Sequence, residues 1–350
     1  MEMRTLIIGG GLSGLALADA LETAGLDYLL VDGRNRFGGR IMTETHGGGY
    51  FDMGPAWFWP GQPRIASLAR RFDLKVFDQY ADGDLLFENQ HGQVQRGRGF
   101  SSMEGSWRFK GGMQSLIRAL SGHLPKERYR LGTHVTALEN NGSQLTATFA
   151  SGESTVASAA VFALPPRLAA QVRFTPSLPA PTLQAMQGVN TWMAGQAKAL
   201  AVYDTPFWRH AGLSGDASSR FGPMVEIHDA SPNEGGPFGL FGFIGVPPLG
   251  RRDEHELRLQ VSAQLTRLFG SAAARPDALF IKDWAYDPLT STPADREPLQ
   301  THPEYGLPDA MKGIWSGKLL FAGTEVAGQF GGYLEGALEA AEAVVRDLLK

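Results

Sequence analysis

A glycine-rich turn near the start of the chain has the residue types and the spacing that hold a phosphate. Gly9, Gly11 and Gly14 form a G-x-G-x-x-G pattern between a short apolar run and a segment with helical spacing. Such glycines permit a tight turn, a close backbone approach to a pyrophosphate and close helix packing. Asp32 follows Gly14 by 18 positions (32 − 14), close to the ~20 expected for an acid that accepts a ribose hydroxyl. The pattern predicts dinucleotide binding and leaves FAD and NAD both open.

Two further glycine turns could complete this site. Gly38-Gly39-Arg40 comes just after the acid and could close over a pyrophosphate that stays bound, although alone it would be an ordinary loop. Near the other end, an apolar run leads into Gly323 and Glu325. Glu325 could hold a ribityl or ribose hydroxyl, cap the last helix, or do both. We interpret the two ends of the chain as halves of one flavin site.

Lys198 and Tyr333 are the side chains that could take part in chemistry. Lys198 is the only charged residue in a strand-like run at 196–203. A buried lysine needs an acceptor or a functional water, whereas a lysine on an edge strand reaches solvent, and both readings stay open. Tyr333 follows two glycines that let something flat approach, so it could form a cavity wall. Three tryptophans are further candidate walls or simple core: Trp57, Trp59 and Trp284.

Composition limits the class of protein. The 350 residues are 43% hydrophobic with a net charge of −4, which gives no reason to expect nucleic acid or a membrane as partner. Cysteine is absent, which excludes thiolate metal sites and a flavin linked through sulfur. The histidines have no helix-spaced pair and no metal is expected. A first strand starting at Thr5 leaves no room for a signal peptide, so we expect a cytoplasmic location.

Helix and strand signals alternate at both ends and surround a β-rich middle. Strands are expected at 5–8, 28–31, 129–138, 145–149, 156–164, 196–203, 224–228, 238–246 and 279–284, and helices at 63–72, 111–120 and 252–269. Residues 81–108 read as irregular with short strands, and 174–179 as a linker. The pattern predicts an α/β fold in which a mostly parallel sheet carries an inserted, smaller domain of mixed sheet and helix. The expected cofactor domain is 1–75, 111–168 and 285–350, and the expected substrate domain is 76–110 and 169–284.

Taken together, these motifs resemble the flavin amine oxidase family, which includes monoamine, polyamine and L-amino-acid oxidases. The resemblance runs through most of the chain, from the first glycine turn through Gly111-Gly112-Met113, the Val161-Phe162-Ala163-Leu164-Pro165 run, Lys198 and Pro206-Phe207-Trp208 to Tyr333. It implies a Rossmann-like FAD domain of the GR2 type. It also implies hydride transfer from the carbon beside an amine to flavin N5, with O2 as acceptor and a small amine as substrate.

The resemblance also implies a role for individual residues. Lys198 would hold a water at flavin N5, and Tyr333 would be one of two cage aromatics. The residues expected to bind FAD are Gly9, Gly11, Leu12, Ser13, Gly14, Asp32, Gly33, Arg34, Gly39, Arg40, Met53, Gly54, Pro55, Ala56, Trp57, Val135, Trp284, Gly323, Glu325, Gly332, Tyr333 and Leu334. Of these, residues 54–57 and 332–334 would lie along the isoalloxazine.

Three departures from the family pattern bear on the reaction. Without cysteine, FAD is expected to bind non-covalently. Pro293 and Ala294 occupy the stretch of the second cage aromatic, and the segment between Leu74 and Gly111 is short. These departures keep two alternatives open. One is another flavin chemistry on the same scaffold, such as desaturation or renalase-like oxidation of NAD(P)H, and the other is a non-catalytic flavin-binding protein.

Overall fold

The computed structural model describes residues 4–297, 299 and 301–349, and a five-stranded parallel sheet forms its base. In spatial order the strands are β20 (Leu319–Phe321), β13 (Ala159–Phe162), β1 (Thr5–Ile8), β2 (Tyr28–Val31) and β9 (Tyr129–Arg130). Strands β1, β2 and β13 are buried along their whole length, as expected when both faces of a parallel sheet are covered. The predicted Rossmann-like α/β fold is confirmed.

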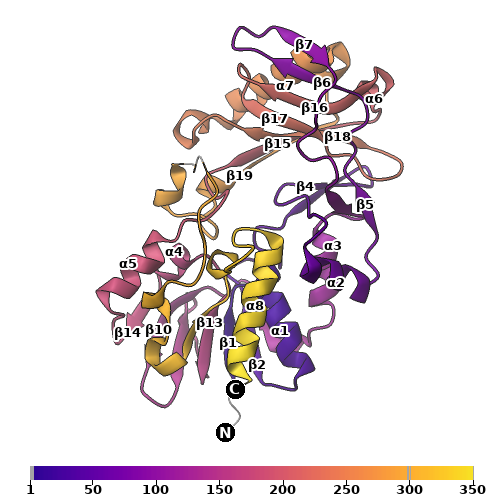
Figure 1. Ribbon diagram of the computed structural model, residues 1–350. Helices are drawn as coiled ribbons and strands as arrows, with labels where there is room; N and C mark the ends of the chain where they lie inside the picture. Colours follow the sequence, from indigo (N-terminus) through magenta and orange to yellow (C-terminus); the bar gives the residue numbers. More distant parts are fainter. Residues whose placement is uncertain (1–3, 298, 300, 350) are drawn as a thin grey trace.

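Helices from the two ends of the chain pack together on one face of this sheet. Helix α1 (Leu12–Thr23) follows β1 directly, and helix α8 (Leu334–Leu348) lies against it (Figure 1). Both helices contribute to one apolar core together with α2 (Pro63–Arg71) and α3 (Gln114–Ser121). Helices from both ends of the sequence therefore share one hydrophobic layer.

A four-stranded sheet covers the other face of the parallel sheet. Its strands in spatial order are β12 (Ser154–Ala157), β11 (Leu145–Phe149), β10 (Val135–Asn140) and β14 (Arg173–Thr175). Val31 of β2 and Leu138 of β10 belong to the same buried cluster. Helices α4 (Pro166–Ala169) and α5 (Ala180–Gly188) pack against each other beside this layer.

A seven-stranded, mostly antiparallel sheet forms the upper part of the molecule in Figure 1. Its strands in spatial order are β19 (Ala278–Asp283), β15 (Ala197–Tyr203), β18 (Phe238–Ile244), β17 (Met224–Asp229), β16 (Leu213–Ser219), β6 (Asp84–Glu88) and β7 (Val94–Gly97). Helix α7 (Glu254–Phe269) covers one face through a cluster that includes Ala199 and Val261. Leu200 and Val202 point to the opposite face, where they meet Phe51 and Trp57.

Shorter elements connect these layers. They are the strand pairs β3 (Thr43–His46) with β4 (Gly49–Asp52) and β5 (Val76–Asp78) with β8 (Trp107–Phe109), helix α6 (Phe207–His210), and the 3-10 turns η1 (Lys126–Arg128), η2 (Pro248–Arg251), η3 (Ser271–Ala274), η4 (Trp284–Tyr286), η5 (Pro293–Arg296), η6 (Asp309–Met311), η7 (Ile314–Gly317) and η8 (Thr324–Val326). Within the described ranges, every helix is too short or too polar to cross a lipid bilayer.

Some expected strand limits are wrong for local reasons. The expected strand 129–138 is divided into β9 and β10, which belong to different sheets, because Gly132 has a φ of +63° and turns the chain. The expected strand 156–164 is divided at Ser158, where the backbone N–H bonds instead to the carbonyl of Arg4. The linker expected at 174–179 begins with two residues of β14. Strand β16 was not predicted.

The expected domain limits remain a prediction. The seven-stranded sheet takes β6 and β7 from the first part assigned to the substrate domain and its other strands from the second part. Strand β14 also falls in that second part, yet it pairs with β10 beside the parallel sheet. We propose that the second part of the substrate domain begins after α5 rather than at residue 169.

Candidate functional site

A cavity of about 880 Å³ extends from the first glycine turn to the seven-stranded sheet. The lining includes every residue that the sequence analysis assigned to the cofactor or to catalysis, apart from Gly14 and Glu325. Residues from both ends of the chain therefore face one space, although their individual roles stay predictions. The lining also contains residues that the sequence analysis missed, among them Thr133, His134, Trp192, Met193, Glu226 and Phe243.

The turn between β1 and α1 has the geometry of a phosphate cradle. A Cβ on Gly14 would lie 1.9 Å from the Gly9 carbonyl oxygen, so Gly14 permits close packing and does not face the cavity. A Cβ on Gly11 would meet nothing closer than the Gly38 oxygen at 3.9 Å. The N-cap residue of α1 is Gly11, and among the described residues no side chain caps the helix, so its first N–H groups remain available for an anion.

Asp32 is fixed at the end of β2 by two backbone donors. Its Oδ2 accepts from the N–H of Gly10 at 2.7 Å, and its Oδ1 accepts from the N–H of Arg34 at 2.7 Å. The side chain is buried but lines the cavity. Each carboxylate oxygen can accept a second hydrogen bond, so the residue can still receive a ribose hydroxyl.

Arg40 and Glu325 join the two ends of the chain below the cavity. Nη1 of Arg40 lies 2.5 Å from Oε1 of the fully buried Glu325. Glu325 therefore does not cap α8, whose N-cap position is Tyr333. Its other oxygen, Oε2, is buried and receives no hydrogen bond from the described part of the chain. Ser13 makes a second link, since its hydroxyl donates to the Ala322 carbonyl.

Lys198 is buried in the cavity wall, so the alternative of an edge-strand lysine reaching solvent is wrong. Strand β15 lies between β18 and β19, and only 6% of Lys198 is exposed. Its Nζ donates to the carbonyl oxygen of Gly54 and lies 4.8 Å and 4.9 Å from the ring centres of Phe241 and Phe243. Burial lowers the pKa of Lys198 from 10.5 to about 8, and Asp52 opposes this shift.

The segment at residues 53–57 forms a wall next to Lys198. The indole of Trp57 donates to Oε1 of Gln79 at 2.8 Å, and that of Trp284 donates to the Met53 carbonyl at 3.1 Å. A Cβ on Gly54 would lie 2.0 Å from the Arg40 carbonyl oxygen. These contacts hold the backbone of the segment against the arginine turn.

Tyr333 lines the cavity, and its ring has aromatic neighbours that the sequence did not reveal. Its ring stacks on His302 with centres 5.0 Å apart and an angle of 15°, and His302 meets Trp192 edge-on at 5.0 Å. The neighbouring Gly331 makes room for the side chain of Tyr305. Pro293 and Ala294, in the stretch of the second cage aromatic, lie outside the cavity lining.

Comparison with known proteins assigns the family. The family of flavin containing amine oxidoreductases matches residues 12–99 and 95–349, and the chain belongs to it. A probable flavin-containing monoamine oxidase A of Dictyostelium discoideum is 21% identical over 451 aligned positions, which cover 98% of this chain and 96% of the relative. The alignment is longer than the 350 residues here, so the relative contains segments that this chain lacks.

The putrescine oxidase of Kocuria rosea is 22% identical, with 83% of this chain and 84% of the relative covered. A solved structure of putrescine oxidase bound to putrescine matches with a TM-score of 0.83 and 20% identity, covering 100% of this chain and 99% of the other. Cyclohexylamine oxidase from Brevibacterium oxydans matches with a TM-score of 0.82 and 21% identity over both full chains. The protein is an FAD-dependent oxidoreductase with an amine oxidase fold.

The residues present fit FAD. The cavity volume lies within the ~300–1,000 Å³ of typical ligand sites. The uncapped start of α1 suits a pyrophosphate, and the unsatisfied Oε2 of Glu325 suits a hydroxyl of the bound molecule. Gly11 leaves the approach to the backbone open, because a Cβ there would meet only the Gly38 oxygen at 3.9 Å.

Proposed function

We propose that the enzyme oxidises the carbon–nitrogen bond of a small amine, with FAD bound non-covalently and O2 as the electron acceptor. When bound, FAD would supply the two-electron acceptor for a hydride equivalent from the carbon beside the nitrogen. The single observation that carries the proposal is Lys198, an amine buried among aromatic rings at the cavity wall. Such a group is costly to bury and is typical of a functional site.

Lys198 is suited to holding a water molecule inside the cavity. An ammonium has three donors, and only the carbonyl of Gly54 is bonded to Nζ among the described residues. We propose that the remaining donors hold a water beside the reacting edge of the cofactor. The surrounding rings of Trp57 and Phe243 would limit access of bulk water.

The rest of the machinery would bind and orient. The N–H groups at the start of α1 would face the pyrophosphate, and Asp32 would accept from the adenosine ribose. Arg40, held by Glu325, would remain oriented toward the cavity. Tyr333 would form one side of the substrate space, supported from behind by His302.

The test is anaerobic mixing of the yellow protein with a panel of primary and secondary amines in a stopped-flow instrument. We expect at least one amine to bleach the flavin, and air to restore the colour with release of hydrogen peroxide. Bleaching by NADH or NADPH but by no amine would instead support renalase-like chemistry, and bleaching by a saturated apolar substrate alone would support desaturation. Family membership favours any of these enzymes over a non-catalytic flavin-binding protein.

Non-covalent attachment and a cytoplasmic location are also proposals. The chain has no cysteine that could form a thioether with the flavin. Acid precipitation should therefore release all of the yellow colour into the supernatant. A cysteine-free chain is compatible with a reducing compartment.

A further inference from the structure

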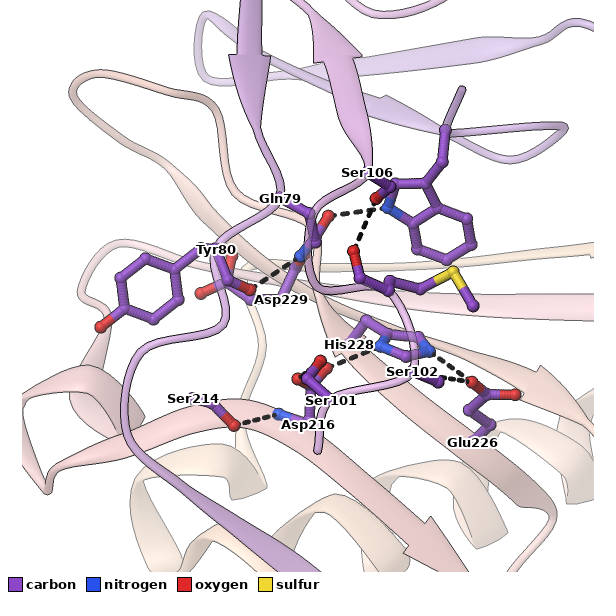
Figure 2. A network of polar contacts seen from close by, with 12 residues as sticks. Gln79, Tyr80, Ser101, Ser102, Ser106, Ser214, Asp216, Glu226, His228 and Asp229 are labelled. Carbon is purple, nitrogen blue, oxygen red and sulfur yellow. Dashed lines mark hydrogen bonds and ion pairs between the residues drawn. The ribbon is translucent and has the colours of Figure 1, made fainter. Parts of the chain in front are cut away.

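A buried ionic chain lies behind the substrate end of the cavity, and the proposed reaction does not use it. His228 is buried on β17, with Nδ1 at 2.6 Å from Oδ1 of Asp216 and Nε2 at 2.9 Å from Oε1 of Glu226 (Figure 2). Carboxylates only accept hydrogen bonds, so both ring nitrogens must donate and the imidazole is protonated. Burial disfavours this charge, but the two carboxylates outweigh burial and raise the pKa of His228.

This chain ends in a carboxylate that faces the cavity. Glu226 lines the cavity, and 38% of its side chain is exposed. Its Oε1 also accepts from the hydroxyl of Ser102 at 2.6 Å. Within the described part of the chain, no donor bonds to its second oxygen, Oε2. Two carboxylates and one imidazolium leave one negative charge, and Glu226 presents it to the cavity.

Strand pairing places Glu226 beside the proposed reaction centre. Phe243 of β18 pairs with Lys198 on one side and with Glu226 on the other. Directly paired residues point to the same face of a sheet, so all three side chains line one wall. Two strand spacings separate Lys198 from Glu226, about 10 Å between their backbones.

We propose that Glu226 binds a second cationic nitrogen of the substrate, at the end remote from the bond that is oxidised. This inference rests on the proposed amine oxidation and specifies its substrate class as amines with a second positive charge. Phe243, between the two groups, would contact the carbon chain that joins the two nitrogens. The same carboxylate would repel a substrate with a carboxylate at this end, so simple amino acids are disfavoured.

A role of Glu226 as the base that deprotonates the reacting ammonium fits less well. The hydrogen bond from His228 lowers the pKa of Glu226 below its ordinary value, although burial opposes this. A carboxylate of lowered pKa is a weak proton acceptor at neutral pH but a permanent anion. Its environment therefore favours binding a cation.

The first measurement uses the wild-type holoenzyme and needs no variant. Pairs of substrates with equal chain length are compared: diaminobutane with butylamine, and diaminohexane with hexylamine. A charge-assisted hydrogen bond is worth roughly ten- to a hundredfold in binding, so kcat/KM for at least one diamine should exceed that of its partner by about tenfold or more. Equal values for every pair would overturn the inference.

The second measurement uses Glu226→Gln, which keeps an oxygen to accept from Ser102 and His228 but removes the negative charge. We expect KM for diamines to rise about tenfold or more, with kcat/KM for monoamines within about threefold of wild type. Glu234→Gln removes an exposed carboxylate from the loop between β17 and β18 and should change neither. An equal loss for both substrate types in Glu226→Gln would instead indicate a structural role and contradict the proposal.

Binding can be measured without turnover. The holoenzyme is reduced anaerobically with dithionite and titrated with each amine by calorimetry, so no oxidation occurs. The diamine should bind to the wild type about tenfold more tightly than the monoamine does. The two amines should bind to Glu226→Gln with equal affinity. If no amine reduces the oxidised flavin, the proposed function fails. If monoamines reduce it and diamines gain nothing, only the present inference fails.

Discussion

At the scale of the residue, Lys198 shows how the strand pattern directs one side chain. Alternate residues of β15 face α7, and the intervening ones face the opposite side of the sheet, where Lys198 lines the cavity. Lys198 is therefore on the cavity face because its neighbours Ala197 and Ala199 pack under the helix. Replacement of Lys198 should leave the helix side of the sheet intact and change only the cavity.

Lys198→Met tests the role of this lysine. We expect the variant to retain FAD but to slow flavin reduction, reoxidation by O2, or both, by about a hundredfold. This factor is the lower end of the range for positioned side chains that transfer a proton in the transition state. Stopped-flow traces of the two half-reactions give these rates. Lys75→Met, at an exposed lysine, is the matched control. Wild-type rates in both half-reactions would exclude Lys198 from the mechanism.

The lowered pKa of Lys198 also predicts a pH dependence of stability. The pKa is about 8 in the folded protein and 10.5 ordinarily, so between these values the unfolded chain binds more protons than the folded one. The free energy of unfolding should therefore rise with pH in this window, by about 1 kcal/mol between pH 7 and 9 relative to Lys198→Met. Urea unfolding of both apoproteins measures the difference. A difference that stays constant or falls with pH would contradict the assignment.

Single residues were predicted from the sequence where a backbone motif identifies them. Asp32 follows from its distance to the glycine turn, because the geometry of a βαβ unit fixes that distance. Glu226 and His302 could not be found, since their roles depend on pairing between β17 and β18 and on contact with Tyr333. The spacing of residues along the chain does not predict those contacts.

At the scale of the element, two glycines of the first turn have different functions. A methyl group on Gly14 would collide with the Gly9 carbonyl, whereas one on Gly11 would only touch the Gly38 oxygen at 3.9 Å. Gly14 is therefore required by the packing of the fold, and we propose that Gly11 is required by the bound cofactor.

This difference predicts opposite results for two alanine variants. Gly14→Ala should lower the free energy of unfolding of the apoprotein by about 2 kcal/mol or more, because the turn must shift. Gly11→Ala should leave that stability within about 0.5 kcal/mol and weaken FAD binding by tenfold or more. Urea unfolding and fluorescence titration with FAD measure the two effects. An apoprotein destabilised as strongly by Gly11→Ala as by Gly14→Ala would contradict the distinction.

The prediction of elements succeeded where burial gives a strong pattern. Strands β1 and β2 are apolar runs bounded by turns, and their limits are those expected. Strand β16 has the sequence LSGDASS, whose polar and small residues give no strand signal, yet its neighbours β17 and β6 hold it in the sheet. Tertiary pairing outweighs local propensity there.

At the scale of the whole molecule, FAD should act as part of the core. The cavity separates the layers around the parallel sheet from the seven-stranded sheet, and its lining comes from both. A ligand bound only by the folded state stabilises it by about 2.7 kcal/mol at a hundred times its dissociation constant. The apoprotein should therefore gain several degrees in its unfolding midpoint on titration with FAD. Scanning calorimetry would reveal this, and an unchanged midpoint at saturating FAD would argue against the proposed site.

The general architecture was predictable because the cofactor motifs are at both ends and β-rich sequence lies between them. The pairing of distant strands within the sheets was not predictable. Strand β14 joins β10, and β6 joins β16, across long stretches of chain. Which distant strands pair depends on the summed packing of the core and not on any one segment.

The hydroxyl of Ser13 bonded to the carbonyl of Ala322 has a consequence for the order of events during synthesis. The cradle emerges first, but the strand and helix that close it are made about three hundred residues later. A nascent chain could thus recognise no more than a fragment of the nucleotide. Tight capture of the flavin must wait until β20 and α8 have been synthesised.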